Sequence, residues 1–156
     1  MNICFKWRCI AVPTVSCTTD IIFVLDESGS VGTASFDLLK YFLTQIVDRL
    51  DIDSSNTRVG VVTYSTNVTA TINLKDHSSV AGLQSAISSL NYSAGGTTNM
   101  TAALAYVRTV MLTSAAGDRS DVPNVVIVLT DGESDNVAAT QVCMNIIRHK
   151  WGEFWS

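Results

Sequence analysis

Residues 26–30, Asp-Glu-Ser-Gly-Ser, place one carboxylate and two hydroxyls at alternate positions directly after a strongly apolar run. Alternate side chains of an extended backbone point the same way, so Asp26, Ser28 and Ser30 are predicted to converge while Glu27 points elsewhere. Oxygen donors of this kind bind Mg²⁺, Mn²⁺ or Ca²⁺, and the absence of a nearby His or Cys argues against zinc or copper. The alternative is a serine-rich turn whose side chains cap the following helix.

A second aspartate, Asp131, follows another fully apolar run, residues 125–129. Without a partner, Asp26 and Asp131 would each be an unpaired charge beside an apolar sheet edge, and no Lys or Arg adjoins either position in the sequence. A shared cation would balance both charges. The second aspartate therefore favours a cation site over a serine-rich turn.

The elements that would position these residues alternate between strand and helix patterns, with apolar runs or alternation for strands and apolar residues three or four apart for helices. Alternation of this kind predicts an α/β fold: a Rossmann-like, doubly wound, mostly parallel sheet with one antiparallel edge strand and helices on both faces. Ligands of such sheets bind beyond the carboxyl ends of the strands, where the strand order reverses. The predicted strands are 21–25, 58–64, 68–74 and 125–129, with the first and last as the central pair, and the predicted helices start at Thr33 and cover 80–90 and 104–111.

The composition excludes several classes of function. A chain of 156 residues with 47% hydrophobic and 15% charged residues is predicted to be one globular domain. The net charge of -4 and the scattered basic residues argue against nucleic acid, and no apolar stretch is long enough to predict a membrane span. An enzyme is not predicted, because the chain has no G-x-G-x-x-G, Walker or G-x-S-x-G motif and His77 and His149 lack partners at recognisable spacing.

Four segments in order, DIIFVLDESGSVG, RVGVVTYS, GGTTNMTAAL and NVVIVLTDGESDN, resemble the von Willebrand factor type A domains of collagens, matrilins and integrin I domains. The resemblance covers roughly residues 18 to 142 and implies the family's metal-ion-dependent adhesion site. Asp26, Ser28 and Ser30 match it directly, Asp131 is the aspartate of its T-D-G signature, and Thr98 is its threonine.

The threonine assignment rests on the alignment of GGTTNMTAAL, in which Thr97 is the less favoured neighbour of Thr98. Met100 stands where the common pattern has a second threonine, a departure that removes no expected ligand.

The resemblance implies an adhesion module that is not an enzyme. Its hydroxyls, and aspartates that act through bound water, would hold a divalent cation, Mg²⁺ first and Mn²⁺ or Ca²⁺ as alternatives. The cation would remain electrophilic. It could then accept an Asp or Glu carboxylate from a protein ligand such as collagen or another matrix protein. Rim residues would choose the partner, with Glu27, Tyr92, Glu133 and Ser134 as candidates that are otherwise ordinary solvated loop residues.

The chain divides into residues 1–17, a leader or linker that fits a secretory signal poorly, 18–142, the incomplete domain, and 143–156, a divergent tail. The last strands and helix of the family are expected to be missing. The strand before Asp131 would then have an exposed apolar edge, which predicts marginal stability or self-association through that edge. Alternatively, the tail covers it with Trp151, Phe154 and Trp155.

The sequons at Asn67, Asn91 and Asn99 and the matrix-type position of Cys17 favour an extracellular, secreted protein. The family's partner for Cys17 is expected to be lost; a bond from Cys17 to Cys143 is an open alternative that we do not predict. Two other interpretations remain: an intracellular scaffold domain of a larger complex, and a non-functional truncated fragment.

Overall fold

A computed structural model describes residues 18–93 and 95–131 of the chain. These residues form a four-stranded sheet in the order β3-β2-β1-β4, in which only the β2–β3 pair is antiparallel. The mostly parallel α/β fold with one antiparallel edge strand is therefore confirmed. The elements are β1 (Thr19–Asp26), α1 (Gly32–Val47), β2 (Thr57–Tyr64), β3 (Val68–Ile72), α2 (Val80–Ser88), α3 (Met100–Tyr106), the π-helical η1 (Val107–Met111), the 3-10 turn η2 (Ser114–Ala116) and β4 (Asn124–Leu129).

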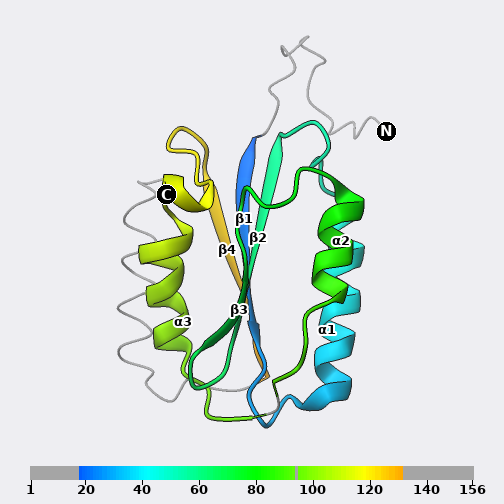
Figure 1. Ribbon diagram of the computed structural model, residues 1–156, viewed down its shortest axis with the longest axis vertical. Coiled ribbons are helices and arrows are strands. Elements are labelled where there is room, and N and C mark those ends of the chain that lie inside the picture. Colours follow the sequence, from blue (N-terminus) through cyan, green and yellow to red (C-terminus); the bar gives the residue numbers. More distant parts are fainter. Residues whose placement is uncertain (1–17, 94, 132–156) are drawn as a thin grey trace, which may run out of the picture.

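The sheet is the middle of three layers, with α1 and α2 on one face and α3 on the other (Figure 1). Successive side chains of a strand point to opposite faces, and β1 follows this rule. Phe23 and Leu25 pack into the core cluster that contains α1 and α2, whereas Ile22 and Val24 pack into the cluster that contains α3 and η1. The apolar run of β1 is buried on both faces because helices cover both.

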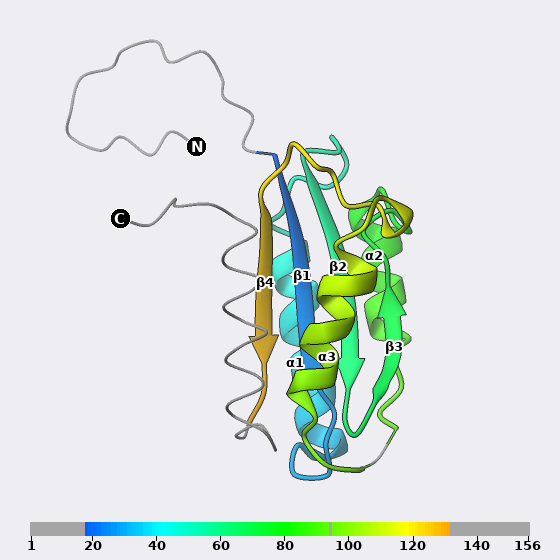
Figure 2. The same cartoon turned by 90° about the vertical axis from the view of Figure 1, so that its left-hand side faces the viewer.

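The strand order reverses between β1 and β4. Helix α1 leads from β1 to β2 on one side, while the chain reaches β4 on the other side of β1 after passing along the opposite face in α3 (Figure 2). Strands β1 and β4 run parallel in register, with Leu25 opposite Leu129, so Asp26 and Asp131 follow neighbouring carboxyl ends. This is the place at which open α/β sheets bind ligands.

Strand β4 pairs with β1 as predicted but is not central. It forms the edge of the sheet among the described residues, and none of its side chains is fully buried; Val125 is 42% exposed. Whether this edge is exposed, as predicted, or covered by the tail with Trp151, Phe154 and Trp155 depends on residues outside the described ones. The predicted helix over 104–111 is also not uniform, because α3 passes into the wider π turn of η1.

The amino end of β1 is closed by a buried ion pair. Asp20 is fully buried and accepts hydrogen bonds from the Arg119 backbone at 3.0 Å and from its Nε and Nη2 at 2.9 and 2.6 Å. Arg119 also donates to the carbonyls of Thr19, Ser55 and Asn56. One guanidinium thus joins the start of β1 to the loop before β2.

No helix among the described residues is long and apolar enough to cross a membrane.

Candidate metal site

The site begins with Asp26, which ends β1 and is fully buried. Its Oδ1 accepts a hydrogen bond from the Ser28 backbone N–H at 2.8 Å, and its Oδ2 accepts one from the Thr130 hydroxyl at 2.6 Å. The first bond fixes the turn that follows β1, and the second joins the ends of β1 and β4. The carboxylate is therefore held rigidly at the reversal of the strand order.

Hydroxyl contacts extend from Asp26's loop to Asp131. The Ser28 and Ser30 hydroxyl oxygens lie 3.1 Å apart, and Ser30 Oγ donates to Asp131 Oδ1 at 3.2 Å. Four of the five predicted ligands, Asp26, Ser28, Ser30 and Asp131, thus belong to one connected group. The serine-cap alternative is wrong, because helix α1 begins after Val31 and has no side-chain cap hydrogen bond.

The fifth predicted ligand, Thr98, lies on a loop fixed on both sides. Before it, Gly96 accepts a 3.4 Å hydrogen bond from the Gly29 N–H; after it, Asn99 N–H donates to the Ser65 carbonyl at 2.9 Å. The Asn99 side chain caps α3 through the Ala102 N–H. The Thr98 side chain makes no hydrogen bond to the other four residues among the described atoms, so its place in the ligand set stays a prediction.

Gly96 is required where this loop passes the β2–β3 turn. Its φ is +102°, a conformation that side chains disfavour, and a Cβ here would collide with the Thr66 hydroxyl. The same hydroxyl accepts a hydrogen bond from the Thr97 N–H at 3.1 Å. The double glycine of the sequence therefore lets the loop lie close to the hairpin.

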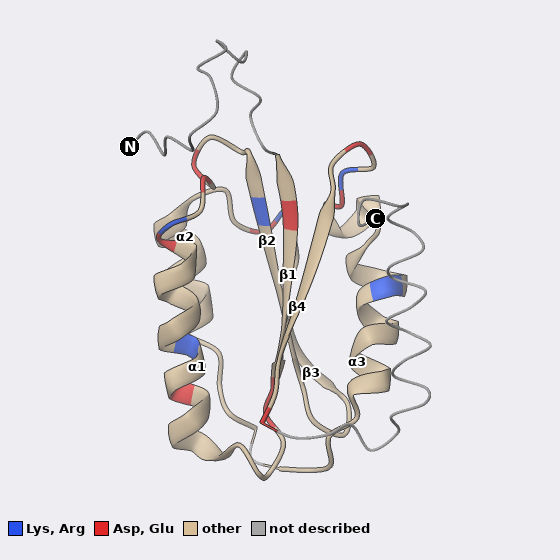
Figure 3. Ribbon diagram, turned by 180° about the vertical axis from the view of Figure 1, so that it is seen from behind, with Lys and Arg blue, Asp and Glu red and all other residues tan. Residues whose placement is uncertain are grey.

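The carboxylates of the site have no basic partner within residues 18–93 and 95–131. The ion pairs of the described residues are Lys40 with Asp37 and Arg119 with Asp20, both away from the site. Figure 3 shows acidic residues where β1 and β4 end and no basic residue on the described ribbon around them. A buried carboxylate without a counter-charge is costly, so the geometry favours a cation from solution.

Tyr64 adds a neutral group beside Asp26, its register partner at the end of β2. Its hydroxyl is buried close to Asp26 and Thr130, but its geometry makes no hydrogen bond among the described residues. Burial, followed by the negative charge of Asp26, raises the pKa of the Tyr64 hydroxyl, which therefore stays protonated. The phenol supplies no positive charge, so the negative charge of Asp26 stays unbalanced and still favours a cation.

The donor types fit a hard divalent ion. No group of three or more His, Cys, Asp or Glu side chains able to hold a metal occurs within residues 18–93 and 95–131. The predicted set instead combines two carboxylates with three hydroxyls, all oxygen donors of the kind that Mg²⁺ and Ca²⁺ prefer. The residues present therefore fit such an ion.

Glu27 does not lie on the rim of the metal site as expected. It is fully buried and accepts a hydrogen bond from the Ser93 hydroxyl at 2.6 Å. The prediction that it points away from the ligands holds, but it points into the protein because another loop covers it. Tyr92 is half-buried and donates to the Ser28 carbonyl at 3.0 Å. Glu133 and Ser134 lie outside the described residues, as do the four cysteines.

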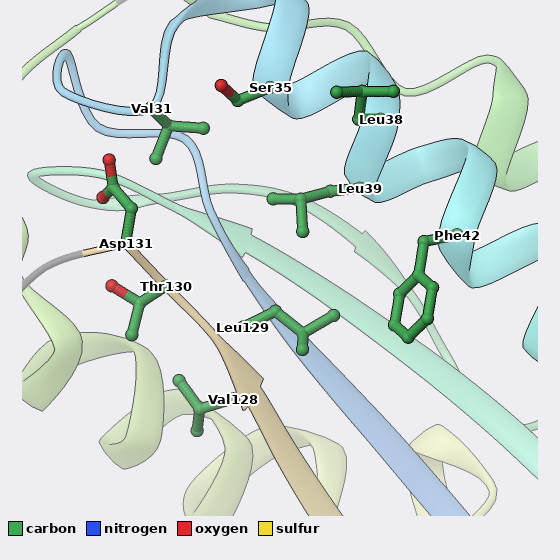
Figure 4. A pocket seen from close by; sticks show the side chains of 9 residues that line it. All are labelled: Val31, Ser35, Leu38, Leu39, Phe42, Val128, Leu129, Thr130 and Asp131. Carbon is green, nitrogen blue, oxygen red and sulfur yellow. The ribbon is translucent and has the colours of Figure 1, made fainter.

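The sequence also missed Thr130 and Ser93 as supporting residues. Thr130 immediately precedes Asp131, so strand alternation could have indicated that its hydroxyl points to the other side of β4 from Leu129, as Figure 4 shows. No sequence signal marked Ser93, which is 66 residues from its partner.

A largely apolar groove of about 420 Å³ begins at Asp131 and runs between α1 and β4 (Figure 4). Leu38 and Phe42 of α1 are 68% and 52% exposed beside it. A partner that reaches Asp131 would therefore meet apolar surface next to the polar site. The groove is lined by Val31, Ser35, Leu38, Leu39, Phe42, Val128, Leu129, Thr130 and Asp131.

Fold and site define a von Willebrand factor type A domain. The family's model matches residues 20–150, and the chain belongs to this family. The resemblance inferred from the four segments is confirmed.

Relatives that the chain resembles include the mouse (Mus musculus) collagen alpha-4(VI) chain, 39% identical over 119 residues, and mouse matrilin-1, 40% identical over 118 residues. These matches cover 75% and 73% of this chain but only 5% and 23% of the relatives. The chain thus spans less than a quarter of the length of these relatives.

Among solved structures, proximal thread matrix protein 1 from the mussel byssus superposes with a TM-score of 0.79 at 25% identity, covering 86% of this chain and 36% of that one. A second structure of the mussel protein, with a zinc-occupied MIDAS motif, has a TM-score of 0.76 at 30% identity and covers 86% of this chain and 34% of that one. MIDAS denotes the metal-ion-dependent adhesion site. The fold therefore supports a divalent cation site, and the lack of His and Cys does not by itself exclude zinc from such a motif.

Proposed function

We propose that this chain is a metal-dependent adhesion module that binds an extracellular matrix protein through a divalent cation and does not act as an enzyme. The observation that carries the proposal is Asp26: a fully buried carboxylate that has no basic partner in the described part of the chain and is joined through Ser28, Ser30 and Thr130 to the end of β4. The family membership and the collagen and matrilin relatives support the same function.

The ligand set that we propose is Asp26, Ser28, Ser30, Thr98 and Asp131. The two carboxylates would balance the charge of the ion, while the three neutral hydroxyls would hold it without neutralising it further. Mg²⁺ is the proposed ion. It would supply a Lewis-acidic position for an Asp or Glu carboxylate of the partner, and the residues around the apolar groove would contact the rest of that partner.

An extracellular location accompanies this proposal. It is supported by the matrix relatives and by the exposed sequon residues Asn67 and Asn91. Asn99 is a poorer glycan acceptor, because its amide both caps α3 and donates to the Thr66 carbonyl at 3.1 Å.

Calorimetric titration with Mg²⁺ and Mn²⁺ tests the cation site. We expect saturable binding that is lost in Ser28→Ala and Asp131→Ala and retained in Ser88→Ala, a matched control whose hydroxyl only bonds a carbonyl within α2. Circular dichroism of each variant checks that it is folded. Equal binding heats for folded Ser28→Ala, Asp131→Ala and the parent would rule out the site.

A solid-phase assay on immobilised collagen VI and matrilin tests the adhesive role. We expect binding in Mg²⁺ that EDTA abolishes and that Asp131→Ala lacks. Binding that is unchanged in EDTA would contradict cation-mediated adhesion even if the metal titration succeeds.

A further inference from the structure

Glu27 is a buried carboxylate that the proposed ligand set does not use. Its Oε1 accepts the Ser93 hydroxyl hydrogen bond, while its Oε2 is buried without a partner among the described residues. Burying such a group costs free energy, so an apolar residue would serve better if the position only needed filling. Its place between Asp26 and Ser28 instead connects it to the cation site.

Ser93 belongs to the loop that leads to Thr98. This loop contacts the Asp26–Ser30 segment at three points: Tyr92 hydroxyl to the Ser28 carbonyl at 3.0 Å, Ser93 to Glu27 at 2.6 Å, and Gly29 N–H to the Gly96 carbonyl at 3.4 Å. The Ser93–Glu27 bond is the shortest of the three and the only one between side chains. A hydrogen bond to a carboxylate is also about twice as strong as a neutral one.

The loop needs such an attachment because its backbone is permissive. Gly95 and Gly96 both have positive φ, at 129° and 102°, and glycine adopts many conformations at little cost. A bond at Ser93 reduces this freedom just before Thr98. The loop that carries one ligand is thereby tied to the segment that carries three.

We propose that Glu27 is a positioning residue of the cation site: through Ser93 it holds the loop of Thr98 against the segment of Asp26, Ser28 and Ser30. The inference rests on the proposed function. It assigns the buried carboxylate an indirect role, in which its hydrogen bond orders the ligands before the ion arrives.

Mn²⁺ binding followed by electron paramagnetic resonance tests the role, on protein made in bacteria because Ser93 completes the sequon of Asn91. We expect Ser93→Ala to weaken Mn²⁺ binding about tenfold or more, the loss typical of residues that orient metal ligands. Ser93 is exposed, so this change leaves no buried cavity. Ser93→Thr keeps the hydroxyl and should restore binding, and Ser88→Ala should bind as the parent does.

Glu27→Gln separates positioning from charge. If Glu27→Gln weakens Mn²⁺ binding but Ser93→Ala does not, Glu27 acts through charge alone and the positioning role is overturned. A lower Tm of Ser93→Ala in EDTA with unchanged Mn²⁺ affinity marks a merely structural bond and overturns it as well. Failure of the parent to bind Mn²⁺ refutes the proposed function and this inference together, whereas parent-like binding by Ser93→Ala refutes this inference alone.

Discussion

The two ends of β1 each hold a buried carboxylate, but in opposite electrostatic environments. Asp20 and Asp26 are both fully buried, six positions apart on one strand. Asp20 receives three hydrogen bonds from Arg119, which also neutralises its charge. Among the described residues, Asp26 accepts hydrogen bonds from a backbone amide and a hydroxyl, both neutral.

The difference separates a structural carboxylate from the one that we propose to bind a cation. At the amino end, the protein supplies the cation from its own sequence, so the charge contributes to the fold. At the carboxyl end, the charge is left unbalanced among the described residues, which suits a site that takes its cation from solution. Buried oxygens without a hydrogen-bond partner occur at both ends among the described residues, on Glu27 and Tyr64 at the second end and on Asp118 and Asn124 at the first, so the contrast lies in the charge partner alone.

The largest expected effect is at the amino end. Arg119→Ala should lower the free energy of unfolding by about 3–5 kcal/mol, because it leaves the buried Asp20 charge without its partner. Urea denaturation, with and without Mg²⁺, measures the loss, which should be the same in both conditions. Arg49→Ala, at an exposed position after α1, should change little. A loss below about 1 kcal/mol for Arg119→Ala would contradict the structural role of this pair.

Asp20→Asn should lower the stability, because it removes the charge that pairs with Arg119, whereas Asp26→Asn should not. In EDTA, the side-chain oxygen of the introduced amide still accepts from the Ser28 N–H while the unbalanced charge is gone, so stability should be unchanged or higher. In Mg²⁺, the parent should gain about 2.7 kcal/mol at a hundredfold excess over Kd, and the variant should gain nothing. Thermal melts in EDTA and Mg²⁺ compare the two. Equal losses for both variants in EDTA would remove the contrast between the strand ends.

Tyr64→Phe should change the free energy of unfolding by no more than about 1 kcal/mol at neutral pH, because it removes a hydroxyl that makes no hydrogen bond to the residues described here. The raised pKa gives a second signature. Above the ordinary pKa of 10.0, the unfolded phenol loses its proton while the folded one keeps it, so the parent's stability falls as pH rises. The variant should lose this part of the alkaline slope in urea titrations at about pH 9 to 11; an identical slope would contradict the burial of this hydroxyl.

The smallest effect is expected at the edge of β4, the strand whose carboxyl end supplies Asp131. The strand carries no charge and Val125 is exposed, so copies of the chain are predicted to associate weakly there. Val125→Lys should remove any dependence of Tm on protein concentration while leaving Mn²⁺ affinity unchanged. A concentration-independent Tm in the parent would dismiss self-association.

The sequence predicted the elements of the site better than the contacts between them. Buried strands and the hairpin follow from short-range patterns, so β1 and β2 were predicted within two residues of their observed ends. Asp26, Ser28 and Ser30 lie together as predicted, but through a turn after β1 and not through the extended backbone that the alternation assumed. That Asp131 joins them follows from parallel strands ending at one edge of a sheet.

Long-range polar contacts escaped prediction because no local pattern encodes them. Arg119 meets Asp20 across 99 residues, and Ser93 meets Glu27 across 66. Strand alternation gave the side of the backbone to which Glu27 points but not the loop that covers it. The placement of β4 at the sheet edge depends likewise on which segments pair, a property of the whole chain.

The direction of β1 has a mechanical consequence for an adhesive domain. A ligand held beyond Asp26 and a tether through the residues before Thr19 would pull on opposite ends of this one strand. β1 is paired on both sides, with β2 from Thr19 to Asp26 and with β4 from Asp20 to Leu25, so the load would shear both ladders at once. Such a geometry resists extension because many hydrogen bonds must rupture together, and single-molecule pulling along this axis should give higher rupture forces than peeling β3 from the opposite edge.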